Sequence, residues 1–222
     1  MARGKGIEEI IRYPASNCHP SLEPVSWHLH MNELTIEKSA TALVIIDLQK
    51  GVITMPTEPY SAKAVVANAV KLAEAFRKNT MPVFLVRVTF SPDGKDTLKP
   101  IADSPTQWKQ SLPADWADIV PELGPKPEDI VITKRQWGAF HGTELDLQLR
   151  RRGIKTIVLC GISTNIGVES TARFAYEYGY QQIFAEDATA ARSKEEHEHT
   201  LKTTFARIGR VRKTQEIMDS VA

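Results

Sequence analysis

A continuous apolar run near residue 41 constrains the fold of this chain more than any other feature. The segment 41–49, TALVIIDLQ, begins with successive apolar residues rather than with alternating ones. Such a run is typical of a strand that is covered on both faces, as in a parallel sheet. A segment with apolar residues at helical spacing follows over 61–80, and a second apolar run occupies 81–90. Together the three segments predict a β-α-β unit.

The same alternation of strands and helices continues to the end of the chain. Further strands are predicted over 129–134, 155–161, 180–187 and 210–213, and helices over 142–153, 165–178, 193–208 and after the last strand. The helix over 193–208 opens with a predicted capping box from Ser193 to Glu196. Repeated alternation predicts an α/β fold of three layers, α-β-α, with a mostly parallel, doubly wound sheet.

Two segments lie outside this alternation. Residues 1–38 mix Pro, Ser, His and isolated aromatic residues without a sustained period. We expect an N-terminal extension there, followed by a single domain over 39–222. Residues 91–129 are rich in Pro, Asp and Trp, and no period is clear. We expect this segment to pass over the site and to shape its pocket.

Composition limits the class of partner. A chain of 222 residues that is 42% hydrophobic and 25% charged suits one globular domain. Lys and Arg number 28 against 27 Asp and Glu, so we expect a small-molecule partner and no nucleic acid. No membrane span or signal peptide is expected. Cys18 and Cys160 lie far apart in the sequence, which argues against a disulfide framework and favours a cytoplasmic protein.

Candidate site residues are the polar ones that end the apolar runs, because ligands of parallel sheets bind outside the carboxyl ends of the strands. They are Asp47, Arg87, Lys134, Asp187 and the loop 163–165. A buried Asp47 carboxylate needs a cation, and Lys134 is the obvious candidate. The alternatives are a purely structural ion pair for these two residues, a scaffold salt bridge for Arg87, and a capping role for Asp187.

Three motifs resemble those of a known family when they are taken together and in order. They are ALVIIDLQKGV, KRQWGAFHGTELDLQLRRRGI and VLCGISTNIGVESTARFAYEYGYQQIFAEDATAA, which lie within 41–191. This set resembles the isochorismatase-like hydrolases, also called the cysteine hydrolase superfamily, to which nicotinamidases and carbamoylsarcosine amidases belong. The resemblance implies a Rossmann-like fold and a hydrolase.

In the amidases of this superfamily, an Asp, a Lys and a nucleophilic Cys act together. The resemblance matches Asp47 to the Asp and Lys134 to the Lys, and Gly167 stands in the place of the Cys. Covalent amide cleavage needs a nucleophile beside a base, and glycine supplies none. Thiol-dependent amidase activity is therefore not expected. Ser163 and Thr164 carry hydroxyl groups in the same loop, but each would need a dedicated base.

True isochorismatases resemble this pattern, with Gly in the Cys position, and they cleave a vinyl ether. The resemblance implies that Asp47 acts there as a general acid toward the enol-ether carbon before water adds. Burial would raise the pKa of Asp47 and assist proton donation, whereas Lys134 would lower it. The sequence leaves open which effect is larger. A catalytically silent member that binds a metabolite, or that serves in an assembly, is the alternative.

Substrate-binding candidates surround the matched residues. A carboxylate is expected to bind Arg87 and the loop of Ser163, Thr164 and Asn165, where a helix N-terminus supplies free N–H groups. Trp137 and Phe140 either wall an apolar side of the pocket or pack in the core.

No cofactor or metal is expected. Nicotinamidases hold a metal with Asp and His residues after the second strand, and the corresponding segment here, VRVTFSPDGKDTL, has no histidine. His197 and His199 are expected on a solvated helix. A nucleotide-dependent oxidoreductase would need a glycine-rich turn after the first strand, which DLQKGVITMP does not supply. The resemblance implies a homodimer or homotetramer.

Overall fold

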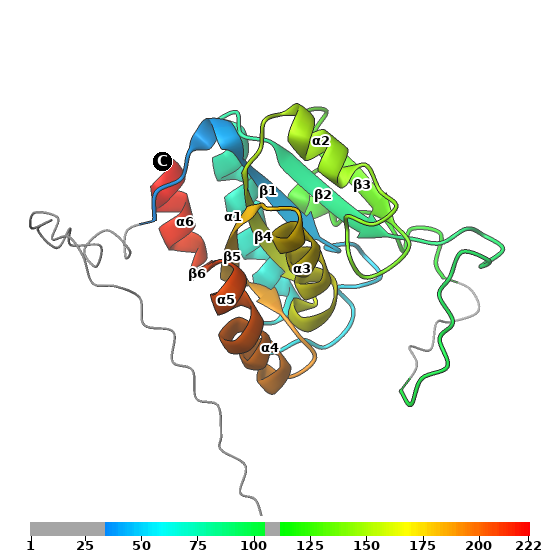
Figure 1. Cartoon of the computed structure of the whole chain (residues 1–222). Coiled ribbons are helices and arrows are strands. Elements are labelled where there is room, and N and C mark those ends of the chain that lie inside the picture. Colours follow the sequence, from blue (N-terminus) through cyan, green and yellow to red (C-terminus); the bar gives the residue numbers. More distant parts are fainter. Residues whose placement is uncertain (1–33, 105–111) are drawn as a thin grey trace, which may run out of the picture. The chain divides into compact units, whose positions relative to one another are not determined.

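A single six-stranded sheet forms the centre of the domain. The computed structural model describes residues 34–104 and 112–222. All its strand pairings are parallel, in the order β3-β2-β1-β4-β5-β6. The strands are β1 (Thr41–Ile46), β2 (Val83–Val88), β3 (Ile130–Lys134), β4 (Thr156–Ile162), β5 (Gln181–Ala190) and β6 (Arg210–Arg212). The predicted α-β-α fold is confirmed, and the strand order reverses between β1 and β4 (Figure 1).

Helices cover both faces of the sheet (Figure 1). One face carries α1 (Ala62–Lys78) and α6 (Thr214–Val221), whose buried residues join one core cluster. The other face carries α2 (Leu145–Arg151), α3 (Glu169–Glu177) and the π-helical turn η4 (Leu201–Phe205). The remaining elements are η1 (Lys38–Ala40), η2 (Pro121–Leu123), the π-helical turn η3 (Thr164–Val168), α4 (Lys194–Thr200) and α5 (Ala206–Ile208).

The first strand explains why the apolar run is continuous. Every residue of β1 is buried. Leu43 and Ile45 belong to the cluster beneath α1, and Val44 and Ile46 belong to the opposite cluster. Successive side chains of a strand point to opposite faces, so a strand covered on both faces needs apolar residues at every position.

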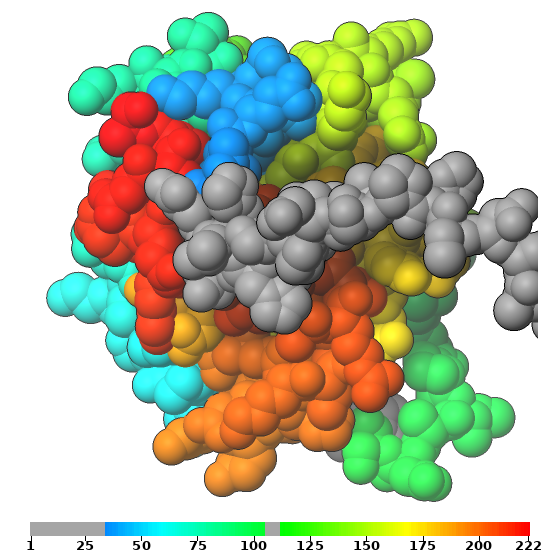
Figure 2. Space-filling view, turned by 60° about the vertical axis from the view of Figure 1, so that its left-hand side comes forward, coloured from blue at the N-terminus to red at the C-terminus, as the bar shows by residue number. Residues whose placement is uncertain are grey.

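Two predicted helices differ locally from the structure, one at its start and one in its interior. The predicted helix over 165–178 begins as the π-helical turn η3, and the helix over 193–208 is interrupted by η4. Most of the predicted N-terminal extension lies outside the described residues, but Ile36 is buried in the core. Lys38 Nζ donates to the backbone oxygen of Ala222 at 3.0 Å, which brings residue 38 beside α6 (Figure 2). No helix of the described residues has the length and apolar character needed to cross a membrane.

Candidate active site

The site lies at the carboxyl ends of the central strands, where the strand order reverses. Asp47 follows β1, Ser163 follows β4, and Lys134 ends β3. These ends surround a pocket of about 1020 Å³ that also reaches Trp137 and Gly167. This position is where open parallel sheets bind their ligands, because neighbouring connections leave the sheet on opposite faces and open a crevice.

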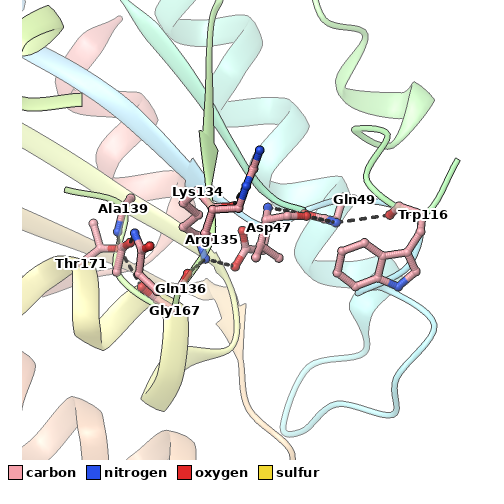
Figure 3. Close-up of polar contacts among 11 residues, drawn as sticks. Asp47, Gln49, Trp116, Lys134, Arg135, Gln136, Ala139, Gly167 and Thr171 are labelled. Carbon is pink, nitrogen blue, oxygen red and sulfur yellow. Dashed lines mark hydrogen bonds and ion pairs between the residues drawn. The ribbon is translucent and has the colours of Figure 1, made fainter. Parts of the chain in front are cut away.

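Asp47 and Lys134 form a buried ion pair at the floor of the pocket. The Lys134 Nζ atom lies 2.6 Å from Asp47 Oδ2 and also donates to the carbonyl oxygen of Gln136 at 3.1 Å (Figure 3). The two residues are 6% and 2% exposed. Asp47 has a φ of 54°, a left-handed conformation that is uncommon outside glycine and that clusters at functional sites. The backbone therefore holds the carboxylate in a fixed direction.

Burial decides the protonation of Asp47. It raises the pKa of Asp47 to about 6, because removal from water outweighs both the attraction of Lys134 and the hydrogen bond from it. Among the described residues, no donor hydrogen-bonds the buried Oδ1 atom. An unpartnered carboxylate oxygen favours the protonated acid. Of the two opposing effects named from the sequence, desolvation is thus the larger.

Gly167 brings the backbone of η3 close to this carboxyl group. A Cβ atom placed on Gly167 would lie 3.1 Å from Asp47 Oδ2 and 3.1 Å from Ile46 Cγ2. The Gly167 carbonyl accepts a hydrogen bond of 2.7 Å from Thr171 Oγ1, and this hydroxyl accepts one of 3.1 Å from the Ala139 backbone (Figure 3). Through these two hydrogen bonds, Thr171 connects the segment after β3 to η3, and both segments lie beside Asp47.

The segment that follows β2 contributes another wall of the pocket. Leu98, Pro100, Leu112, Pro113, Asp115 and Trp116 line it, as the prediction that 91–129 shapes the pocket requires. Gln49 anchors this wall: it donates to the carbonyl oxygens of Val88 at 2.9 Å and Trp116 at 3.2 Å, and its Oε1 accepts from the Val88 backbone. Gln49 is fully buried, so the wall is fixed to the ends of β1 and β2 (Figure 3).

The predicted substrate-binding residues divide into two groups. Trp137 and Ser163 line the pocket with Asp47, Lys134 and Gly167. The structure places the other four, Arg87, Phe140, Thr164 and Asn165, outside the pocket lining. Trp137 is 58% exposed, which leaves its ring free to contact a ligand.

Thr164 is fully buried, and the other three residues of the second group have environments of their own. Arg87 Nε donates to Thr133 Oγ1 on the neighbouring strand at 3.2 Å. Phe140 is buried in the core against the rings of Tyr178 and Tyr180, which corresponds to the core-packing alternative. Asn165 is partly buried, and its Oδ1 atom has no hydrogen-bond partner among the described residues. Outside this group, Asp187 lies within β5, so it does not cap a following turn as the alternative had it; it accepts hydrogen bonds from the backbone and hydroxyl of Thr214 at the start of α6.

The prediction that His197 is solvated is wrong. It is 1% exposed, and its Nδ1 atom lies 2.9 Å from the buried Thr164 hydroxyl at the start of η3. Burial lowers the pKa of His197, so the ring is neutral near pH 7. Its ring also meets that of Tyr60 edge-on. His199, two positions further, is exposed as predicted. The ring of His197 is not part of the pocket lining and supports the turn that carries Gly167 through this contact with Thr164.

Replacing His197 with alanine is expected to lower the free energy of unfolding by about 1–3 kcal/mol, since the buried Thr164 hydroxyl would lose its partner. His199→Ala on the same helix is the control, and it is expected to change stability by no more than about 0.5 kcal/mol. Urea denaturation of both variants gives the comparison. Equal effects of the two substitutions would contradict the supporting role of His197.

The pocket contains a cation that the sequence analysis did not identify. Arg192 lines the pocket just after β5. The strand β5 continues to Ala190, beyond its predicted end at residue 187, and Arg192 lies two residues after Ala190. Because β5 extends to Ala190, Arg192 lies at the same sheet edge as Asp47. Among the described residues, no three His, Cys, Asp or Glu side chains are grouped closely enough to hold a metal ion.

The fold and the site together define a class: Rossmann-like α/β proteins with a buried Asp–Lys pair at the point where the strand order reverses. Comparison with known proteins narrows this class. The family model described as the isochorismatase domain matches residues 41–216. The chain belongs to the isochorismatase family of hydrolases.

Relatives of this chain include both uncharacterised proteins and an amidohydrolase. The uncharacterised isochorismatase family protein YwoC of Bacillus subtilis is 56% identical over 192 residues, which cover 86% of this chain and 99% of YwoC. The ureidoacrylate amidohydrolase RutB of Rhizobium rhizogenes is 31% identical over 178 residues, which cover 70% of this chain and 72% of RutB.

Solved structures support the same membership. An isochorismatase family protein from Burkholderia thailandensis superposes with a TM-score of 0.81 at 44% identity, covering 84% of this chain and 97% of that one. The N-carbamoylsarcosine amidase from Thermoplasma acidophilum gives a TM-score of 0.61 at 27% identity, covering 78% and 96%.

Proposed function

We propose that this protein is a small-molecule hydrolase that acts without a covalent thiol nucleophile, with Asp47 as the acid or base and Lys134 as its electrostatic partner. The observation that carries the proposal is the position of Gly167. It lies within Cβ contact of the Asp47 carboxyl group, where a nucleophilic side chain would be activated, and it has no side chain to supply. Residue 167 therefore places no nucleophile beside the acid.

The cysteine that the structure describes does not replace the missing nucleophile. Cys160 is fully buried within β4 and belongs to the core cluster beneath α1. Burial raises the pKa of its thiol, which removes the reactive thiolate at neutral pH. Cys18 lies outside the described residues. Ser163 reaches the pocket, but no described base hydrogen-bonds its hydroxyl. These facts favour a reaction in which water is the nucleophile.

Cleavage of a vinyl ether meets this requirement. Asp47 in its acid form donates a proton to the terminal enol carbon, and the ether oxygen stabilises the resulting cation. Water adds to the cationic carbon and returns a proton to the Asp47 carboxylate. The hemiketal then collapses into a ketone and an alcohol, so one water is consumed and the acid is regenerated. Lys134 holds Oδ2 in place through its 2.6 Å contact and stabilises the carboxylate that forms after proton transfer.

An assay for the products of hydrolysis tests the proposal. Purified protein is incubated with isochorismate, with pyruvate as the readout, and in parallel with amides and ureides, with ammonia as the readout. Turnover is expected to be unchanged after treatment with iodoacetamide, because no thiol takes part. Loss of turnover after alkylation would overturn the thiol-independent mechanism. If no substrate turns over while a metabolite raises the melting temperature, the silent binding member is the correct alternative.

A further inference from the structure

A second cavity lies between helices on one face of the sheet. It is a groove of about 310 Å³ between α3 and the helical segment formed by α4, η4 and α5, and η4 and α5 lie beside α3 (Figure 1). None of its lining residues belongs to the candidate active site. With one apolar exception they are polar or charged: Glu169, Arg173, His199, Thr203, Thr204, Arg207 and the apolar Ile208. The groove is therefore a polar site of its own.

A hydrogen-bonded network centred on Glu169 fixes one of the two arginines of the groove. Glu169 Oε1 accepts from Arg173 Nε at 3.0 Å and from Arg173 Nη2 at 2.7 Å, and it also accepts from Thr204 Oγ1 at 3.0 Å. Glu169 Oε2 accepts from Thr200 Oγ1 at 2.9 Å. Thr204 is 8% exposed, and Thr200 is 1% exposed. Both oxygens of the Glu169 carboxylate are thus bonded to donors, and Arg173 is held in one orientation by buried groups.

Several donors of the groove are not used by this network. Arg173 bonds the network through Nε and Nη2, and no described residue accepts from its Nη1 atom. Within residues 34–104 and 112–222, the guanidinium of Arg207 forms no ion pair and no hydrogen bond, and neither does the ring of His199. His199 and Arg207 lie four residues before and after Thr203, so the three share the face of the helical segment that lines the groove.

The charges of the groove favour an anion. Two arginines against one glutamate leave a net charge of +1, and the imidazole of His199 adds a further donor. A phosphate group carries about −1.5 to −2 charges near pH 7 and has three strong acceptor oxygens. Arginine binds such oxygens through parallel N–H groups. A carboxylate, with two oxygens and one charge, would leave more of these donors without an acceptor.

We propose that this groove binds a phosphate group, either as free phosphate or as part of a small phosphorylated metabolite. Arg207 and the Nη1 atom of Arg173 are its principal donors, and His199 assists them. The groove is about ten times as large as the volume of one water molecule in the liquid, so a group attached to the phosphate has room beside Ile208. This site is separate from the pocket around Asp47 and does not depend on the proposed hydrolysis.

Titration calorimetry with three probes tests the inference. Inorganic phosphate, ribose 5-phosphate and unphosphorylated ribose are titrated into the full chain, at an ionic strength that chloride keeps constant because salt screens exposed charges. Both phosphate compounds are expected to bind, and ribose is not. Tighter binding of ribose 5-phosphate than of inorganic phosphate would identify a phosphorylated metabolite as the ligand, whereas equal affinities would identify free phosphate. Arg207→Gln is expected to weaken both phosphate compounds by about tenfold or more, the loss of one charge-assisted hydrogen bond.

Two arginine variants outside the groove are the matched controls. Arg151 is exposed on α2 and has no ion pair among the described residues, so Arg151→Gln removes a comparable charge elsewhere on the surface. Arg192 lines the candidate active site, so Arg192→Gln shows whether the probes bind there instead. Both controls are expected to bind phosphate as the wild type does. The inference is overturned if neither phosphate compound binds, if Arg207→Gln binds them unchanged, or if Arg192→Gln weakens them as much as Arg207→Gln.

Discussion

Asp47→Asn is expected to lower kcat/KM by roughly 10²- to 10⁴-fold, the range that a positioned acid or base contributes. Asparagine has nearly the same shape but cannot donate a proton to carbon. Asp187→Asn is the matched control, because Asp187 lies within β5, outside the pocket lining, and accepts hydrogen bonds from Thr214 at the start of α6. It is expected to lower stability slightly and to leave kcat/KM unchanged. A variant at Asp47 that retains full activity would remove the proposed acid.

The pH profile of the same enzyme provides an independent readout. With a pKa of about 6, Asp47 is protonated below this pH and ionised above it. A reaction that needs the acid form should show a constant kcat/KM below about pH 6 and a fall of about tenfold per pH unit above it. Residual activity of Asp47→Asn should lack this dependence. A profile that rises through pH 6 would instead identify Asp47 as a base.

The raised pKa also affects stability. The folded state binds the proton of Asp47 more tightly than the unfolded chain, where the pKa is near 3.8. The stability that this proton contributes is fully present below about pH 4 and is lost as the pH rises through 6. The buried carboxyl group thus lowers the stability of the fold at neutral pH and keeps an acid available there.

Gly161→Ala is expected to destabilise the protein by at least about 3 kcal/mol, because backbone strain and overpacking act together. Gly161 has a φ of 122°, and a Cβ atom there would lie 2.0 Å from the Ile46 carbonyl oxygen. The clashing atom belongs to the backbone of β1, which pairs with β4 at this position, so no side chain can turn away. Urea denaturation measures the loss, and low soluble yield would be its first sign.

Gly179→Ala is the matched control for that variant. Gly179 also has a positive φ, 79°, but no atom lies within 4 Å of a Cβ placed on it. Only the conformational cost remains, about 1–2 kcal/mol. An equal loss of unfolding free energy in the two variants would show that the close approach of β1 and β4 at Gly161 adds nothing to the conformational cost.

Much of the fold follows from local patterns. The continuous apolar run of β1, the helical spacing of 61–80 and the glycines that end the helices at 153 and 179 locate the elements within a few residues. Asp47 and Lys134 could also be identified, because each ends an apolar run. His197 could not be placed from the charged stretch around it, since its partner Thr164 lies 33 residues away.

The sequence by itself determined that this chain forms a parallel sheet and which polar residues stand at the ends of its strands, since both depend on near neighbours along the chain. Only the tertiary structure decided which charges meet. Lys134 ends β3, two strands from β1, yet reaches Asp47. Arg87 turns to Thr133, and Arg192 enters the pocket without an ionic partner among the described residues. Charge pairing and burial depend on residues distant in the sequence, and these interactions set the pKa of Asp47.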